Sequence, residues 1–519
     1  MTDIRTAPAD PGTAPTAQLR TVLAGALLAM VLAALDQNIV NTALPRIVGD
    51  LGGMAHLSWV VTAFMLCSTI TTPIYGKLSD IYGRRTLFFV AILVFMAGSL
   101  ACGAAQSMGQ LIGFRALQGL GAGGLLVLAQ AAIGDVVSPR DRPRYQGLFT
   151  GAFALSSVAG PLLGGIITQA FTWRWVFYVN LPVGVLALTM IAIGLRRPPS
   201  RKQRSIDYMG TVLLAGTTAS LLLLLAWGGN EFPWASADTT MLLVAIATFL
   251  GLFLWQETRA AEPLIRLALF RNSVFARGVV VGGMMTFAML GSTVFLPLYF
   301  QLVLGMAPAR AGAMLIPQVV GMLLSSVIGG RIVSRLGHNR PFLLAGIGLE
   351  AVALASLAGF AYLGAAPALF LVSMGGLGLG MGMGMPNLTT AVQNAVSHAE
   401  LGAATGAMTF VRSLGGAVGV ATSGTIMTAR LNAALAGIGG SVNVRALSEH
   451  GIQALAELTK VQQAAVGAAY RTALTGCFLL SGVVMSGAFV LVWGLPEITL
   501  RSRVDETDMV QRAPIRQSS

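Results

Sequence analysis

Long hydrophobic runs separated by short polar ones are the dominant pattern of the chain. Runs of about 20 hydrophobic residues recur along it, and each is long enough to cross a hydrocarbon core of roughly 30 Å as a helix. A spanning barrel would instead need segments of about 10 residues that alternate in polarity, and the sequence has none. The pattern therefore predicts an all-α polytopic membrane protein. We expect fourteen spans, at 21–44, 57–76, 86–104, 109–134, 146–170, 175–195, 209–228, 240–258, 274–302, 310–334, 341–363, 368–392, 406–428 and 472–494.

Composition supports this prediction, and the distribution of charge orients the chain. The 519 residues are 55% hydrophobic and 10% charged, against about 25% charged residues in a soluble domain. An even number of spans places both termini on one side, and most of the 33 lysines and arginines fall on that side. Basic residues accumulate on cytoplasmic loops, so we expect both termini in the cytoplasm. The net charge of +13 is then a topology signal and does not indicate nucleic-acid binding.

Two polar interruptions suggest that the chain has two halves with one plan. Gly76–Arg85 reads GKLSDIYGRR, and Gly330–Arg340 reads GRIVSRLGHNR, with Ser334 at the position of Asp80. We expect a disordered tail at 1–19, six spans at 20–195, and a basic loop with two extra spans at 196–258. Six further spans at 259–496, with a long external segment at 429–471, and a tail at 497–519 complete the expected organisation.

Two opposite charges lie at matching depth in predicted spans of the first half. At 1.5 Å per residue, Asp36 lies about 8 Å below the outer edge of span 1, and Arg115 lies about 9 Å below the same edge in span 4. Ionisable residues inside a membrane are costly and often functional. If the two spans are neighbours, we expect a buried ion pair that breaks when Asp36 takes up a proton. The alternative is a structural pair that never titrates.

A second intramembrane acid lies in the other half. Glu350 lies about 14 Å past Pro341, near the midplane of its span. It is a candidate for proton coupling, and the alternative is a protonated glutamate packed against its neighbours. Arg412 also falls inside a span, and the external loops offer no further candidate chemistry.

A substrate cavity is expected from polar side chains in spans 1 and 4 and from a Met-rich, aromatic stretch in span 9. Methionine is polarizable and adaptable, as a promiscuous site requires, although core packing explains the same pattern equally well. The residues assigned to this cavity are Gln37, Asn38, Asn41, Gln118, Met289, Phe295, Tyr299 and Gln301.

Other motifs argue against an enzyme. Gly119, Gly121 and Gly124 match GxGxxG, but they lie in a predicted spanning helix without the strand that a dinucleotide site needs. The sequence has no GxxxxGK[ST] loop, no HExxH and no His/Cys cluster, so we expect no cofactor, no metal and no ATPase. The three cysteines fall in different spans and are expected to be packing residues.

Several motifs in order resemble the major facilitator superfamily, in particular its fourteen-span drug:proton antiporters. GKLSDIYGRR resembles the cytoplasmic loop after the second helix, which implies a gating loop formed by Gly76, Asp80, Gly83, Arg84 and Arg85. LIGFRALQGLGAG resembles the fourth-helix motif, which includes Arg115 and Gln118. LDQNIVNTALP and WRWVFYVNLPVG resemble further hallmarks of the fourteen-span group.

The fifth-helix motif is associated with export. GAFALSSVAGPLLGG resembles it, with Gly151, Gly160, Pro161, Gly164 and Gly165 at the motif positions. The resemblance implies two six-helix bundles, two extra spans between them, and alternating access around a central site. It also implies a monomeric exporter in the inner membrane of a bacterium that exchanges amphipathic, hydrophobic or cationic compounds for protons. A dedicated exporter of one metabolite or lipid shares every motif, and a membrane-embedded enzyme or a non-transporting receptor is a more distant alternative.

Overall fold

The computed structural model describes residues 16–52, 57–195, 207–229, 232–435 and 460–496, and these ranges are nearly all helical. Most of the two expected tails, the basic loop that begins at Arg196 and the middle of the segment 429–471 lie outside the described residues. The first helix begins at Thr16, within the stretch expected to be a tail.

The N-terminal half contains seven helical segments. They are α1 (Thr16–Leu51), α2 (Leu57–Tyr82), α3 (Arg84–Ala104), α4 (Met108–Val136), α5 (Arg142–Ala170), α6 (Trp175–Tyr178) and α7 (Asn180–Gly194). The expected span 175–195 is thus divided between α6 and α7 at Val179.

The extra pair is α8 (Tyr208–Trp227) and α9 (Ala237–Arg259), and the C-terminal half follows. It consists of η2 (Leu267–Arg271), α10 (Ser273–Thr293), α11 (Leu296–Leu302), α12 (Pro308–Ala313), α13 (Ile316–Leu336), α14 (Arg340–Leu363), α15 (Pro367–Asn394), η3 (His398–Glu400), α16 (Leu401–Leu435) and α19 (Lys460–Trp493). Prolines in the first turn of α11, α12 and α13 accompany the breaks in the expected spans 274–302 and 310–334.

The expected count of fourteen spans is not fully confirmed. Thirteen stretches of helix in the described part of the chain are long and apolar enough to cross a membrane. The remaining expected span, 406–428, lies within α16, which is helical throughout but is not among the thirteen. Its two arginines, Arg412 and Arg430, lower the hydropathy of this helix.

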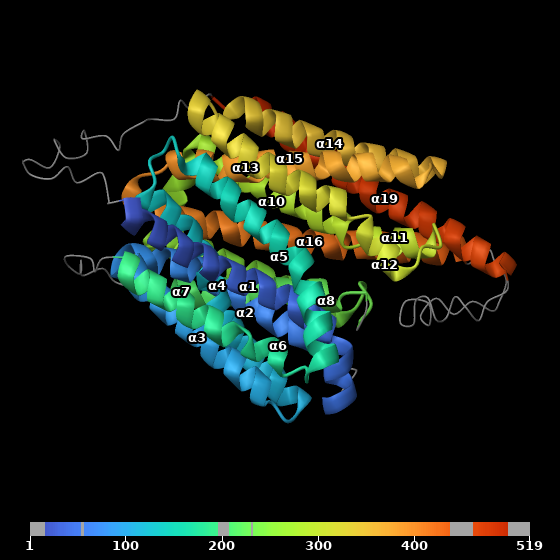
Figure 1. Cartoon of the computed structure of the whole chain (residues 1–519), viewed down its shortest axis with the longest axis horizontal. Helices are drawn as coiled ribbons and strands as arrows, with labels where there is room; N and C mark the ends of the chain where they lie inside the picture. The colour runs from blue at the N-terminus through green and yellow to red at the C-terminus, as the bar shows by residue number, and fades with distance from the viewer. Residues whose placement is uncertain (1–15, 53–56, 196–206, 230–231, 436–459, 497–519) are drawn as a thin grey trace, which may run out of the picture.

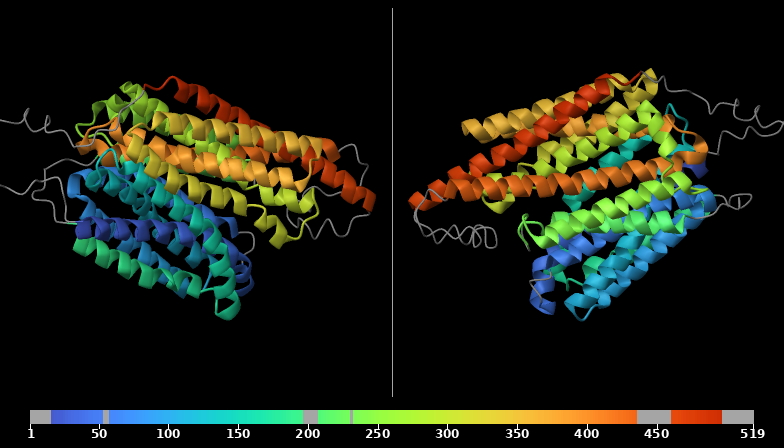
Figure 2. Two further views of the ribbon diagram at one scale, coloured as in Figure 1. Left: turned by 45° about the horizontal axis from the view of Figure 1, so that its top comes forward. Right: turned by 180° about the vertical axis from the view of Figure 1, so that it is seen from behind.

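The two halves lie side by side as two bundles. In Figure 1 most of the blue-to-green helices of the N-terminal half lie below the yellow-to-red helices of the C-terminal half, while α5 runs up toward α13, and Figure 2 shows the two groups from two other directions. Each half has its own hydrophobic core. The halves contact each other through α2 with α16 and α5 with α13, and α8 packs against α2, α9 and α16.

Glycines set the close approach of α4 to its neighbours. A Cβ at Gly121 would lie 2.5 Å from the Phe95 backbone nitrogen of α3, and one at Gly119 would lie 2.5 Å from the Phe64 carbonyl oxygen of α2. The GxGxxG spacing therefore serves helix packing, because only residues without a side chain allow this distance. This packing fixes α4, and with it Arg115, at the centre of the N-terminal half.

Candidate functional site

The Asp36 carboxylate is the centre of a buried polar network. Asp36 is 0% exposed. Its Oδ2 accepts a bond from Arg115 Nη1 at 2.7 Å. Its Oδ1 accepts bonds from Gln118 Nε2 at 2.8 Å and from Asn180 Nδ2 at 2.7 Å. The ion pair expected for neighbouring spans is formed, and the carboxylate has three side-chain donors.

The Arg115 guanidinium is enclosed by the same helices. Its Nη1 also donates to Gln118 Oε1 at 2.7 Å, and its Nε donates to the Val60 carbonyl at 3.4 Å. The guanidinium carbon lies 4.0 Å from the centre of the Phe64 ring, a cation–π contact. Both Nη1 and Nε of this cation therefore have hydrogen-bond partners, and one of its faces is covered by an aromatic ring.

Asn180 is a site residue that the sequence analysis did not single out. Its amide Nδ2 donates both to Asp36 and to Ser99 Oγ, the latter at 2.9 Å, and the side chain is buried. The sequence did contain a clue to its role, because Asn180 is an amide side chain inside a predicted span, directly before LPVG in one of the hallmark motifs. Asn180 is the first residue of α7, directly after the break at Val179, and its amide reaches Asp36 of α1.

The other polar residues of span 1 lie apart from this network. Asn38 Nδ2 donates to the Ala34 carbonyl at 2.7 Å, one turn earlier in the same helix. Gln37 is half-buried and Asn41 is exposed. The structure thus places these three around Asp36 on α1 but brings only Gln118 of the expected cavity residues into contact with it.

The small residues of α5 face two different partners. A Cβ at Gly160 would lie 2.4 Å from Asn38 Cβ, and one at Gly164 would lie 2.9 Å from the Ile39 carbonyl, so this part packs on α1. Gly151 instead faces Leu323 of α13 in the other half. Two further motif residues do not join these contacts, since Pro161 is exposed and Gly165 meets no neighbouring atom within 4 Å.

Asp80 joins the two halves at one end of the bundle, hereafter the charged end. Its Oδ1 accepts the backbone N–H of Gly402 at 3.0 Å and its Oδ2 accepts that of Ala403 at 2.8 Å. These N–H groups belong to the first turn of α16, which lacks intrahelical partners and carries the positive end of the helix dipole. Arg84 pairs with Asp80 at 2.7 Å and with Asp135 at 2.7 Å.

The remaining residues of the predicted gating loop support this seam. A Cβ at Gly76 would lie 2.5 Å from the Gly402 carbonyl, so α2 and α16 cross in close contact. Gly83 has a φ of 85°, which lets the chain turn between α2 and α3. Arg85 is half-buried and lies against the Phe89 ring at 5.8 Å.

The second copy of the loop makes a weaker seam at the same end. Ser334 Oγ donates to Asp141 Oδ1 at 2.7 Å, and Arg140 donates to the carbonyls of Ser334 and Arg335 at 2.9 Å each. A third connection runs through the segment after α9, where Glu262 pairs with Lys77 at 2.9 Å. The two halves are thus held together at the charged end by several polar contacts.

Glu350 lies inside the C-terminal half, away from the Asp36 network. It is 1% exposed, and its Oε1 has no hydrogen-bond partner. The side chain packs against Gly380 and Gly384 of α15, where its Oε1 would lie 3.2 Å from a Cβ at Gly384. A buried carboxyl group without partners is far less costly when it is protonated.

The span 9 residues assigned to the cavity differ in how deeply they are buried. Tyr299 is 0% exposed, and its ring lies 5.2 Å from that of Phe370 and 6.0 Å from that of Phe478. Met289 and Phe295 are half-buried and pack against the same core cluster, and Gln301 is half-buried. Tyr299 is thus a core residue in this conformation.

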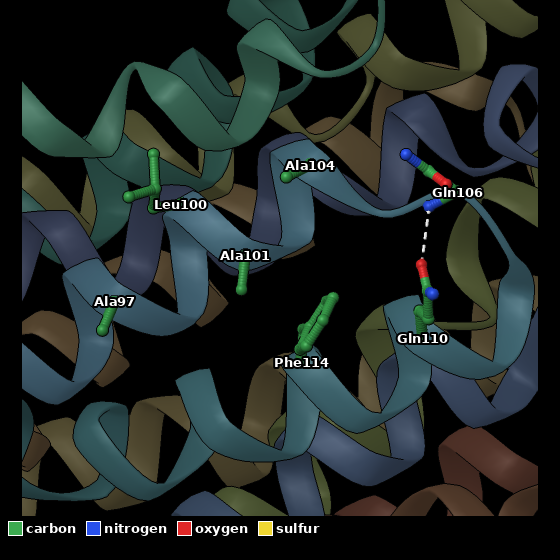
Figure 3. A pocket seen from close by; sticks show the side chains of 7 residues that line it. All are labelled: Ala97, Leu100, Ala101, Ala104, Gln106, Gln110 and Phe114. Carbon is green, nitrogen blue, oxygen red and sulfur yellow. Dashed lines mark hydrogen bonds between the residues drawn. The ribbon is translucent and has the colours of Figure 1, made fainter.

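A groove on the outside of α3 and α4 is a separate feature. Figure 3 shows its lining, in which Phe114 faces Ala101, and Gln106 donates its backbone N–H to Gln110 Oε1 at 2.9 Å. None of the predicted site residues lines it. In the described ranges, no group of three or more His, Cys, Asp or Glu residues is placed to hold a metal ion.

Comparisons with known proteins agree with this architecture. The sequence profile described as Major Facilitator Superfamily matches residues 26–420. The chain is 37% identical over 417 residues to the multidrug transporter protein MdtP of Bacillus subtilis, covering 79% of this chain and 76% of that protein. It is 36% identical over 522 residues to an uncharacterised MFS-type transporter of Mycobacterium tuberculosis, covering 96% of this chain and 74% of the relative.

A solved structure shows the same fold. The proton:xylose symporter XylE superimposes with a TM-score of 0.62 at 15% identity, covering 93% of this chain and 98% of that one. The chain belongs to the major facilitator superfamily and is a multi-pass membrane transporter.

Proposed function

We propose that the protein is a proton-coupled antiporter that exports amphipathic compounds by alternating access. The observation that carries the proposal is the Asp36 network, in which one buried carboxylate is held by a cation and two amides. Relatives named multidrug transporter or multidrug resistance protein support the export of drugs or toxic compounds. The charged end is then the cytoplasmic end, with both termini in the cytoplasm of a bacterial cell.

The network provides a way to couple a proton to a conformational change. With Arg115 in place, the Asp36 carboxylate is stabilised in its ionised form by an opposite charge. Movement of the Arg115 side chain away from Asp36, for example on entry of substrate, separates the pair and removes the charge that stabilises the ionised carboxylate, which then takes up a proton. Re-formation of the pair on the other side of the cycle releases that proton.

Gln118 and Asn180 hold the Asp36 carboxylate independently of Arg115. Both amides donate to Oδ1, while Arg115 donates to Oδ2, so the two oxygens have different partners. Loss of Arg115 alone would therefore free Oδ2 for a proton while Oδ1 stays bound. Proton uptake would then require movement of one side chain only.

Glu350 is a second candidate proton site in the other half. It is buried without partners, so the membrane environment favours its protonated form. We propose that it titrates only when the C-terminal half opens, which would raise the number of protons exchanged per substrate. Replacement by Gln mimics the protonated form and should preserve folding.

The contacts at the charged end form the gate in this proposal. Asp80 holds the first turn of α16, and Ser334 holds Asp141 at the start of α5, so the two halves are closed toward one side of the membrane. Export requires these contacts to open so that substrate enters from the cytoplasm. Contacts of a few kcal/mol or less, such as an acid at a helix N-terminus worth about 0.3–1 kcal/mol, suit such a reversible seam.

The proposal is tested by proton release from purified protein in acid-loaded proteoliposomes. Several unrelated amphipathic compounds should each dissipate the proton gradient, and Asp36→Asn should abolish the response because the replacement amide cannot carry a proton. If Asp36→Asn retains full proton-coupled transport, the coupling role is refuted. If only one compound in a broad panel is transported, the dedicated exporter of a single metabolite or lipid becomes the better description.

A further inference from the structure

Arg412 is a buried cation whose charge the described protein does not balance. It lies in α16 with 9% of its surface exposed. Its Nη2 donates to the hydroxyl of Thr389 at 3.1 Å, and its Nε has no hydrogen-bond partner. Among the ion pairs of the described residues, none involves Arg412.

Two other buried arginines, Arg84 and Arg115, differ in this respect. Arg84 pairs with Asp80 and Asp135, and Arg115 pairs with Asp36. A third, Arg142 at the charged end, has no ion-pair partner among the described residues, but its guanidinium donates to Asn394 Oδ1 and to the Gly134 carbonyl. An unpaired buried cation is costly, and inside a membrane such residues usually face a partner or a water-filled path. The unpaired charge of Arg412 therefore points to an anion that binds there during the transport cycle.

Arg412 lies on the same side of α16 as a residue linked by hydrogen bonds to the N-terminal half. Thr405, Thr409 and Arg412 are four and three residues apart, so they share one side of α16. Thr405 Oγ1 accepts from Gln393 Nε2 at 3.3 Å, and the same amide donates to the Gln130 carbonyl of the N-terminal half at 3.0 Å. This side of α16 thus meets the other half at the closed seam. Arg412 lies about 10 Å further along the helix, toward the middle of the membrane.

Glu350 is not the missing partner in this conformation. Its carboxylate packs against α15 at Gly380 and Gly384 and has an unpartnered oxygen of its own. The Arg412 guanidinium instead occupies the space beside Gly282 of α10, where a Cβ would lie 3.0 Å from its Nε. Arg412 and Glu350 therefore each keep an unpartnered atom within one bundle without contacting each other.

We propose that Arg412 and Thr389 bind the acidic group of an amphipathic substrate, so that the transporter prefers organic anions. This inference rests on the proposed function and names its substrate class. Arginine suits the role because its planar donors fit a carboxylate and it stays charged when buried. The helices α13 and α16 contain no Asp or Glu that would attract a cationic drug to this region.

Three probes with one aromatic body and different charge test the inference. They are pyrenebutyrate, pyrenebutanol and pyrenebutyl-trimethylammonium, titrated against the full-length purified protein and followed by pyrene fluorescence. We expect the anion to bind about tenfold or more tightly than the alcohol, the size of effect that a hydrogen bond to a charged group provides. Arg412→Gln should bring the two affinities within about twofold, whereas Arg412→Lys should keep part of the preference.

Controls separate this inference from loss of folding and from failure of the proposed function. Arg430→Gln removes an arginine from the same helix, whose Nη1 reaches only the Thr472 carbonyl, and should leave the preference unchanged. An anion preference that is absent in the natural protein, or that survives Arg412→Gln, overturns the inference even if proton exchange with other probes continues. Equal loss of all three probes in Arg412→Gln also overturns it, since Arg412 would then serve the general fold. Normal binding without any proton-linked transport would instead count against the proposed function alone.

Discussion

The two halves treat their buried charges in opposite ways. In the N-terminal half, Asp36 is joined to Arg115 and to two amides, so that both the carboxylate and the cation are satisfied. In the C-terminal half, Glu350 and Arg412 are both buried, and each keeps an atom without a partner. An ion pair can form and break during a transport cycle, whereas a buried charge without a counter-ion can be neutralised by an oppositely charged ligand. In our proposal, proton exchange therefore belongs chiefly to the first half, and recognition of the substrate's charge belongs to the second.

The largest expected effect comes from removing one partner of the balanced pair. Arg115→Met leaves Asp36 as an uncompensated buried charge, which should destabilise the protein by about 3–5 kcal/mol. Arg412→Met removes a cation that has no carboxylate partner, so it should change stability by no more than about 1 kcal/mol or should stabilise the protein. Thermal unfolding of both variants in the same detergent measures the contrast.

A third variant tests whether the unpaired charge of Asp36 causes the loss of stability in Arg115→Met. The double change Asp36→Asn with Arg115→Met should recover much of the stability lost in Arg115→Met, because no charge then remains unpaired. Equal destabilisation by Arg115→Met and Arg412→Met would break the comparison, and would mean that Arg412 has a partner of equal value within the protein.

How far the sequence predicts these features depends on the geometry that each one needs. The Asp36–Arg115 pair was predictable because helical rise fixes depth, and depth alone matched the two residues. Asn180 was missed because its contact with Asp36 spans 144 positions and depends on the break between α6 and α7. A helix that is apolar on all sides gives no sign of which side faces the core and which faces the cavity. The sequence therefore could not show that Tyr299 is a core residue. The sequence likewise located Arg412 within a span, but only the packing of α10, α15 and α16 shows that no carboxylate of the described residues lies beside it.

The two copies of the polar loop extend the comparison to the charged end. Asp80 of α2 accepts two backbone N–H groups from the first turn of α16. Ser334, at the equivalent position of α13, donates one bond to Asp141, the residue before α5. The same arrangement of helices is therefore held by a charged acceptor on one side and by a neutral donor on the other. The loss of the acid in the second copy makes the two seams unequal.

An intermediate effect is expected from Asp80→Asn. The change removes the negative charge at the start of α16 and weakens both bonds, which should cost the closed seam about 1.5–3 kcal/mol. At 1.4 kcal/mol per tenfold change, the open form should become about ten to a hundred times more populated. Spin labels on exposed Thr86 and Leu336, placed at the charged end in a cysteine-free background, should report a longer distance. An unchanged distance distribution would show that Asp80 does not hold the seam.

The smallest effect is expected from Ser334→Ala, measured with the same pair of labels. The change removes one hydrogen bond to Asp141 and should cost about 0.5–1.5 kcal/mol, while the Arg140 bonds to the backbone of α13 remain. The population of the open form should therefore rise by only about two- to tenfold. Because the two seams open together when the halves rock as rigid bodies, the costs of Asp80→Asn and Ser334→Ala should add in the double variant. Ser334→Ala opening the charged end as much as Asp80→Asn would reverse the assignment, and would make the second copy of the loop the principal latch.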